Sequence, residues 1–166
     1  MSNRDLYFKL RPPPETPRDE ICTCKGNRPV KLMCALGYNP LHCIDCNLEV
    51  APESLALSER FIEKLVSWRD LYDAIDQLWL DSGEYETWAR EQLTDITSSV
   101  NSRGMALQRD LDVSRRCYFW YFQDQSIEGF QPITQCPNCH GPLAVYPNGI
   151  FPQFVCEQCG IITVGT

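Results

Sequence analysis

The sequence predicts an α+β protein in which two small zinc-bound β modules, a knuckle and a ribbon, flank an antiparallel α-helical hairpin. Three observations lead to this fold class. Eight of the ten cysteines stand in close pairs near the two ends of the chain. The segment between these pairs repeats apolar residues with helical spacing. The chain has 166 residues, 43% of them apolar, which suffices for one ordinary domain or for small modules around a shared core.

The expected organisation has three parts. Residues 1–52 form an N-terminal zinc-binding β module, residues 53–113 an acidic helical hairpin, and residues 114–166 an aromatic strand followed by a zinc ribbon. Charged residues interrupt the first ten positions, and no apolar run reaches the roughly 18 residues of a membrane span, so we expect neither a signal peptide nor a membrane protein. In a cytoplasmic chain thiols stay reduced, which favours metal ligation over disulfides; secretion without a cleaved signal leaves the disulfide alternative open.

Four cysteines near the N-terminus form the first candidate metal site. One residue separates the first two and two residues separate the other two, with eighteen residues between the pairs. Residues 28–36 favour a strand and residues 37–40, Gly-Tyr-Asn-Pro, a turn, so the second pair can return to the first. We predict one zinc ion bound by Cys22, Cys24, Cys43 and Cys46, with Cys34 or His42 as alternatives to one of these ligands.

The central segment predicts two antiparallel helices. Ser58 is a suitable N-cap for the first helix. The Asp-Ser-Gly sequence at 81–83 breaks the pattern, and a second apolar stripe from Tyr85 to Leu111 predicts the returning helix, with Gly104 as a candidate interruption or kink. We assign both stripes to the core rather than to a cofactor site. The first stripe advances by steps of four and three and consists of Phe61, Leu65, Trp68, Tyr72, Ile75 and Trp79.

The strongest chemical pattern is a pair of Cys-x2-Cys sequences near the C-terminus, with sixteen residues between them. This spacing is typical of a zinc ribbon, because two intervening residues let the chain turn so that both sulfurs point at one ion. Pro-Asn-Gly at 147–149 predicts the turn of a hairpin between the pairs. Gly141 and Gly160 follow the knuckles, where positive φ favours glycine. We predict a second zinc ion per chain, bound by Cys136, Cys139, Cys156 and Cys159.

Two cysteines and two histidines remain. Cys34 has apolar neighbours and Cys117 lies in an aromatic run, so we expect both to be buried core residues, Cys117 within a strand. His42 and His140 each adjoin a predicted ligand, which leaves mixed Cys and His coordination open. Each site already has four sulfurs, so neither histidine is required.

The formal charge of −7 is concentrated on the hairpin. Residues 53–113 hold thirteen acidic against six basic residues, whereas residues 1–52 and 114–166 carry +1 and −1. Two zinc ions, each bound by four thiolates, would lower the total charge to about −11. Such a chain repels phosphate on average and attracts cationic proteins. We predict an acidic partner-binding surface, with a solvated helix face as the alternative, made of Asp70, Asp73, Asp76, Asp81, Glu84, Glu86, Glu91 and Asp95.

The motifs favour binding over catalysis. A four-cysteine zinc site leaves no open coordination position, and the sequence has no nucleophile elbow, phosphate-binding glycine loop or zinc-protease helix. We therefore expect no enzyme. Zinc ribbons also serve nucleic-acid machinery, but residues 136–166 contain no Lys or Arg. The basic patches that could contact phosphate consist of Lys25, Arg28, Lys31, Arg115 and Arg116.

The C-terminal two thirds of the chain carry a family resemblance. Its residues are the aromatic run 118–122, the two C-terminal cysteine pairs, and the helical pairs 78–79, 82–83, 85–86 and 88–89. Over about residues 55–166 the chain resembles a bacterial family of zinc-ribbon-containing proteins described as candidate nucleic-acid-binding proteins. The resemblance implies four zinc ligands, the C-terminal cysteines, and no catalytic residues. The N-terminal cysteines have no counterpart in that pattern.

These observations lead to a functional hypothesis. We expect a cytoplasmic, non-enzymatic zinc protein that binds a basic protein, specifically a bacterial immunity protein that neutralises a toxin through its acidic surface. The alternative is a zinc-ribbon nucleic-acid-binding or transcription-associated factor, which the charge makes the less favoured reading.

Overall fold

The computed structural model describes residues 15–34 and 37–166. Residues 1–10, where we expect no signal peptide, and residues 35–36 of the predicted N-terminal strand lie outside the described residues. The helices described are α1 (Glu59–Asp81), α2 (Glu86–Thr94) and α3 (Ser99–Asp112), with 3₁₀ turns η2 (Arg18–Glu20) and η3 (Pro52–Leu55). The strands described are β1 (Val30–Leu32), β2 (Leu41–Cys43), β3 (Cys117–Trp120), β4 (Ala144–Val145), β5 (Gln153–Cys156) and β6 (Ile161–Val164).

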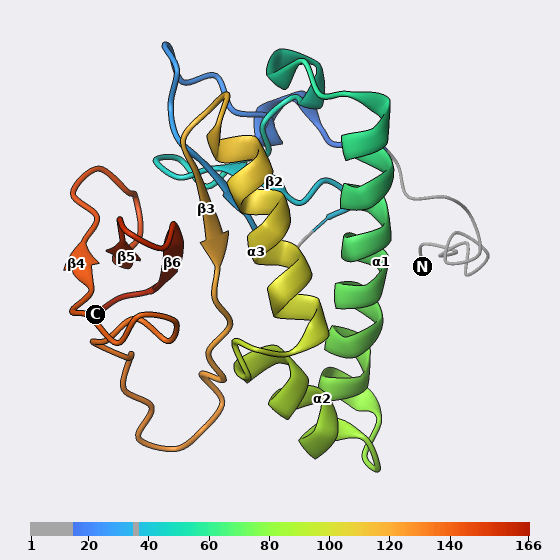
Figure 1. The fold of residues 1–166 in the computed structure, drawn as a ribbon, viewed down its shortest axis with the longest axis vertical. Coiled ribbons are helices and arrows are strands. Elements are labelled where there is room, and N and C mark those ends of the chain that lie inside the picture. Colours follow the sequence, from blue (N-terminus) through green and yellow to red (C-terminus); the bar gives the residue numbers. More distant parts are fainter. Residues whose placement is uncertain (1–14, 35–36) are drawn as a thin grey trace, which may run out of the picture.

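These six strands form one sheet with the order β2-β1-β3-β6-β5-β4 (Figure 1). β3, which comes from the aromatic run, pairs in parallel with β1 on one side and with β6 on the other. The outer pairs are antiparallel. The fold is thus α+β, but the two β modules expected at the ends of the chain are joined into a single sheet. Strands of two to four residues are too short to be stable alone. β3 pairs with the edge of the N-terminal strands on one side and with the edge of the C-terminal strands on the other.

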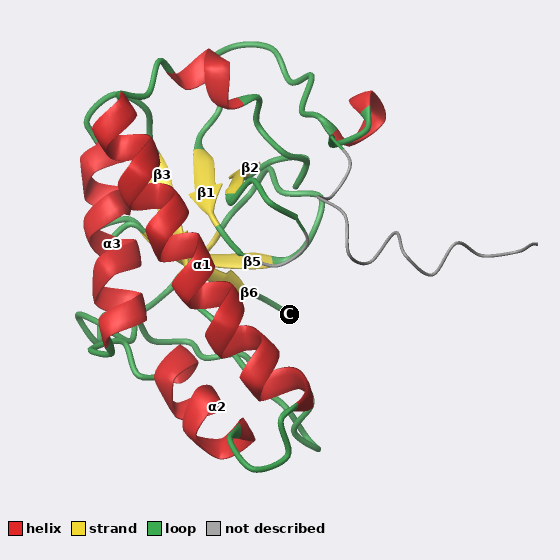
Figure 2. Cartoon of the chain, turned by 90° about the vertical axis from the view of Figure 1, so that its right-hand side faces the viewer, coloured by secondary structure: helices red, strands yellow, loops and turns green. Residues whose placement is uncertain are grey.

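The first predicted helix has the expected cap and core face. The hydroxyl of Ser58 accepts a hydrogen bond from the amide of Phe61 (3.2 Å), which satisfies a free N–H in the first turn of α1. Figure 2 shows α1 and α3 in front of the strands, on one side of the sheet. Among the described residues, no helix combines the length and the apolar character needed to cross a bilayer. The buried residues of α1 are Leu65, Trp68, Tyr72 and Ile75.

The returning helix differs from the prediction because residues 95–98 divide it into α2 and α3. The hydroxyl of Ser98 caps α3 by accepting from the amide of Asn101 (3.3 Å). The buried side chain of Asn101 donates to the carbonyls of Leu93 (2.9 Å) and Asp95 (2.8 Å). These bonds satisfy carbonyls that the end of α2 leaves without helical partners, so the chain can turn there.

Gly104 does not interrupt the helix, so that part of the prediction is wrong: α3 runs without a break from Ser99 to Asp112. The glycine instead allows close packing, because a Cβ atom at this position would overlap the side chains of Trp68 and Phe119. These two rings meet edge to face with their centroids 6.2 Å apart. Gly104 therefore brings α3 against both α1 and the central strand.

A second, smaller core lies on the other side of the sheet. Successive side chains of a strand alternate between its faces, so Phe119 packs under the helices whereas Tyr118 points away from them. Tyr118 packs with Ile44, Val155 and Ile162. Ile44 comes from the N-terminal cysteine-rich segment, whereas Val155 and Ile162 come from the C-terminal one. The sheet therefore places both segments next to one another.

Candidate metal centres

The first cysteine quartet lies at the end of β2. Cys43 is the last residue of the strand, and Cys46 follows in the next turn. The amide of Cys22 donates to the carbonyl of Glu49 (2.7 Å), which holds the first pair beside this turn. The sulfur atoms of all four predicted ligands, with Cys24 as the fourth, lie within 4.8 Å of one another. The shorter Cys-x-Cys pair therefore reaches the same point as the Cys-x2-Cys pair.

The second quartet joins the two turns of the C-terminal ribbon. The amide of Cys136 donates to the carbonyl of Gly141 (2.8 Å), which closes the first turn. β4 and β5 pair as the predicted hairpin and return the chain to Cys156. The sulfur atoms of Cys139 and Cys156 are 3.6 Å apart, and all four, including that of Cys159, lie within 4.8 Å of one another.

A left-handed residue follows each Cys-x2-Cys turn. Asn47, His140 and Gly160 stand directly after the second cysteine of their pairs and have φ values of 61°, 60° and 63°. Gly160 confirms the glycine prediction. At the middle turn the prediction of Gly141 is wrong, because His140 has the positive φ. The three Cys-x2-Cys pairs therefore each end in a residue of the same left-handed conformation.

The geometry of both quartets fits a tetrahedral zinc ion. Zinc bonds thiolate sulfur at about 2.3 Å, so the sulfurs of a tetrahedral site lie about 3.8 Å apart. The distance of 3.6 Å between two sulfurs of the second quartet is close to this value. Four cysteines also supply the soft donors that zinc prefers and complete its coordination shell.

Backbone amides and burial act in opposite directions on the thiols. Burial opposes ionisation of Cys43, but the amides of Cys46 and Asp45, together with neighbouring thiols, outweigh it and lower the pKa of this thiol. At Cys139 the amide of Gly141, together with a neighbouring thiol, lowers the pKa to about 7. Burial raises the pKa of Cys156 to about 12. This thiol would therefore ionise at neutral pH only when a bound cation stabilises the thiolate.

The other cysteines and the histidines join neither quartet. Cys34 and Cys117 are buried in the core under the helices, which confirms the prediction for both. All ten cysteines lie in the described part of the chain, and each is free of a disulfide. His42 pairs with Lys31 across the sheet. His140 is exposed and occupies the left-handed turn position.

The predicted acidic residues lie on α1, on α2 and in the connecting loops, and seven of the eight are exposed. Three of them have local structural contacts. Asp70 pairs with the preceding arginine (2.7 Å), Glu86 accepts from the amide of Gly83 (3.0 Å), and Asp95 accepts from the amide of Thr97 (2.8 Å). The other five are Asp73, Asp76, Asp81, Glu84 and Glu91.

Exposed aromatic side chains occupy the same end of the hairpin. Tyr85 and Trp88, at the start of α2, have exposed fractions of 51% and 47%. Glu84 adjoins the tyrosine, and Glu91 lies about one turn beyond the tryptophan. We call these four residues and Asp81, at the end of α1, the tip surface. It combines apolar area with an excess of negative charge.

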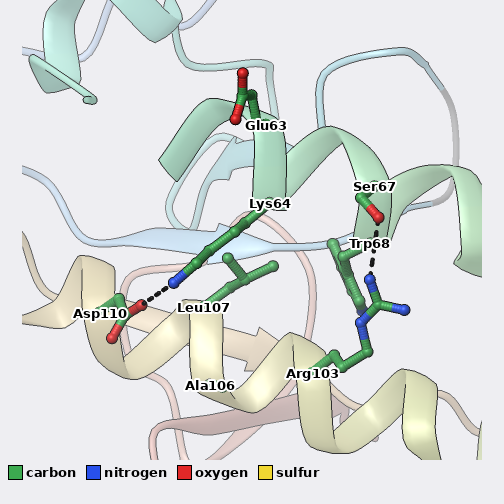
Figure 3. Close-up of a pocket in the computed structure, with 8 residues that line it drawn as sticks. All are labelled: Glu63, Lys64, Ser67, Trp68, Arg103, Ala106, Leu107 and Asp110. Carbon is green, nitrogen blue, oxygen red and sulfur yellow. Dashed lines mark hydrogen bonds and ion pairs between the residues drawn. The ribbon is translucent and has the colours of Figure 1, made fainter. Parts of the chain in front are cut away.

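A groove between α1 and α3 contains none of the predicted site residues (Figure 3). Its volume is about 450 Å³. Lys64 and Asp110 form an ion pair across it (3.9 Å), and Arg103 donates to the hydroxyl of Ser67 (3.0 Å). These contacts pair most of its charged side chains within the groove and join the two helices.

Sequence reasoning missed two polar residues beside the second quartet. The side-chain amide of Asn138 donates to the sulfur of Cys159 (3.3 Å). Glu157 accepts from the guanidinium of Arg116 (2.7 Å) and from the hydroxyl of Tyr118 (2.8 Å), which fixes the second turn to β3. The position of Asn138 inside a Cys-x2-Cys turn was a usable local signal. The partners of Glu157 lie about 40 residues earlier, so no local pattern reveals them.

Comparison with known proteins identifies a family but no function. No curated protein and no solved structure matches the chain. The family described as "Domain of unknown function (DUF2310)" matches residues 35–123, which include the three helices and β3. The matched segment ends before the C-terminal quartet, so the zinc-ribbon part of the resemblance remains a prediction. Because the match covers 89 of 166 residues, more than half, the chain belongs to the DUF2310 family.

Proposed function

We propose that the chain is a non-enzymatic protein-interaction protein in which each cysteine quartet binds one structural zinc ion. The observation that carries the proposal is the closed geometry of the quartets, each with four sulfurs within 4.8 Å. Four thiolates fill a tetrahedral shell and leave no position for a substrate or an activated water. Bound zinc supplies folding free energy to short strands that bury little surface by themselves.

The tip surface is the proposed partner site. Its carboxylates would speed the encounter with a cationic protein by electrostatic steering. Trp and Tyr are the residue types that most often contribute large binding free energies at interfaces. The exposed faces of Trp88 and Tyr85 also suit Arg or Lys side chains of a partner, which stack on aromatic rings. The surface therefore favours a basic protein.

An immunity protein is the specific function that we propose for this surface. A toxin that cleaves nucleic acid needs a cationic active site, because it must bind phosphates. An acidic surface with exposed aromatic anchors complements such a site and would block it. The net charge of −7, which zinc coordination makes more negative, supports this assignment.

Nucleic-acid binding is the alternative, and the contacts of the basic residues give it less support. Arg116 is paired with Asp112 (3.0 Å) and with Glu157 (2.7 Å). Arg115 donates to the carbonyl of Arg28 (2.7 Å). Donors engaged in the fold are less free to bind phosphate. The three carboxylates of the tip surface are exposed, as are its two aromatic residues, so they are accessible to a partner.

Affinity capture from lysate of the source cell, run with and without nuclease treatment and followed by mass spectrometry, tests the partner proposal. We expect a basic protein whose binding weakens at least tenfold in a Glu84→Gln, Glu91→Gln variant and in Trp88→Ala. Glu53→Gln with Glu63→Gln is the matched control, because it removes two charges from η3 and the start of α1, away from the tip surface. Capture of nucleic acid without protein, or equal losses in variant and control, would contradict the proposal. A captured toxin should lose its activity in the complex.

A further inference from the structure

We infer that the two metal sites form one cooperative unit, so that an ion bound at either quartet raises the affinity of the other. The inference rests on the zinc sites proposed above. Its basis is a direct contact between their ligand loops. Ile44 and Asp45 stand between the last two ligands of the first quartet, and both contact the β4–β5 hairpin that connects the pairs of the second.

Asp45 provides the polar part of this contact. The hydroxyl of Tyr146 donates to its carboxylate (2.6 Å), and the amide of Ile150 donates to its backbone carbonyl (2.9 Å). Its second carboxylate oxygen lies 3.4 Å from the guanidinium of Arg28. Tyr146 and Ile150 flank the turn of the hairpin. Each bond from them therefore joins the ligand loop of one site to that of the other.

Gln153 provides the buried part. The residue is 3% exposed, and its side-chain amide forms hydrogen bonds through both its nitrogen and its oxygen. The nitrogen donates to the carbonyl of Ile44 (3.2 Å), and the oxygen accepts from the ammonium of Lys31 (3.1 Å). A buried amide without partners costs free energy, so Gln153 favours the native position of β5 only when the N-terminal turn is also in place.

Apolar packing reinforces the contact. Ile44 is fully buried against Tyr118, Val155 and Ile162. Val155 directly precedes Cys156, a ligand of the second quartet. Displacing Ile44 would therefore expose apolar surface next to both cysteine clusters.

The physical basis of the coupling is conformational entropy. A bound ion fixes its own ligand loop, and a fixed loop presents the contact surface that the other loop needs. The second ion then orders a loop that is already partly held. Linkage requires the effect to be equal in both directions.

Zn²⁺ titration of the metal-depleted full chain, in competition with a chelator under reducing conditions, tests the inference. The wild type is compared with Cys136→Ser, Cys139→Ser, which keeps only the first site, and with Cys22→Ser, Cys24→Ser, which keeps only the second. We expect the product of the two zinc association constants of the wild type to exceed the product of the two single-site association constants about tenfold or more. Equal products overturn the inference but leave two zinc sites. Fewer than two ions in the wild type overturn the proposed function as well.

Tyr146→Phe is a second test that keeps all eight ligands, in case the cysteine variants do not fold. It removes only the hydroxyl bonded to Asp45. Native mass spectrometry at half saturation counts chains with none, one and two ions. We expect the one-zinc fraction to rise, because loss of one hydrogen bond weakens the coupling about fivefold. Tyr85→Phe, on the exposed tip surface, is the matched control and should leave this fraction unchanged. An unchanged fraction in Tyr146→Phe overturns the role of this contact.

Discussion

Gly104 on α3 lies directly against Trp68 on α1, since a Cβ atom at position 104 would be 2.9 Å from the indole nitrogen. The same atom would overlap the ring of Phe119. The indole is held in place because its N–H donates to the carbonyl of Val100 (2.9 Å). We predict that Gly104→Ala lowers the free energy of unfolding by about 1 to 3 kcal/mol, the usual cost of overpacking. Urea denaturation of the zinc-loaded protein measures the change.

Whether Gly104→Ala lowers or raises the free energy of unfolding distinguishes an effect of packing from an effect of helix propensity. Alanine favours an exposed helix interior over glycine by about 1 kcal/mol, so propensity alone would stabilise the variant. Phe119→Leu makes room beside position 104 and should reduce the cost of Gly104→Ala. Equal costs in both backgrounds would show that overlap with Phe119 is not the cause.

Local patterns in the sequence predicted the parts of the structure that depend on neighbouring residues. The helical stripe from Leu65 to Ile75, the Ser58 cap and the Cys-x2-Cys turns are all set within a few positions. The break after α2 had a signal too, because Asp95 and Ser98 are capping residues. The apolar spacing continues across this break, through Leu93 and Ile96, and so favours a single helix.

The single sheet could not be read from the sequence. Its central contacts are parallel pairings between distant segments, such as Val30 with Cys117 and Phe119 with Ile161. A parallel pair needs a long crossover, and no local pattern specifies which strands meet. The contact of Asp45 with Tyr146, across 101 positions, was hidden for the same reason. The clustering of each cysteine quartet was predictable because its spacing is itself the signal.

Metal content should distinguish ligand cysteines from core cysteines. We predict that Cys156→Ser lowers the zinc content from two ions per chain to one, because the loss of one thiolate opens the second site. Cys34→Ser makes the same chemical change in the core and should keep both ions. Metal analysis after gel filtration measures the ratio. Loss of an ion from Cys34→Ser would instead make Cys34 a ligand.

His140→Gly should stabilise the protein without loss of metal. His140 has a φ of 60°, which strains a residue with a Cβ atom, and its side chain is exposed. Glycine relieves this strain but costs more backbone entropy on folding, so we expect a net gain of about 0.5 to 1 kcal/mol. Thermal denaturation with parallel metal analysis checks the prediction. A fall in zinc content would show that the imidazole is a ligand.

The pH dependence of stability should differ between two carboxylates of the acidic segment. Burial, and then the charge of Asp73, raise the pKa of Asp76 above its ordinary value. The folded state therefore binds this proton more tightly than the unfolded chain, so Asp76 destabilises the fold above its folded pKa and not below about pH 4. Asp76→Asn should therefore stabilise the protein at pH 7, because it removes a partly buried charge. This advantage should shrink as the pH is lowered.

Asp95 provides the control of opposite sign. Hydrogen bonds from the side chain and then the amide of Thr97 lower the pKa of Asp95. Its contribution favours the fold above the ordinary carboxyl pKa and is lost as the pH falls through the lowered value. Asp95→Asn should therefore be less stable than the wild type at pH 7, with a deficit that shrinks in acid. Urea midpoints from pH 8 downward, as far as zinc stays bound, compare both variants with the wild type. For each variant, the stability difference from the wild type is plotted against pH. If this difference changes in the same direction for both variants, the opposite pKa shifts of Asp76 and Asp95 are contradicted.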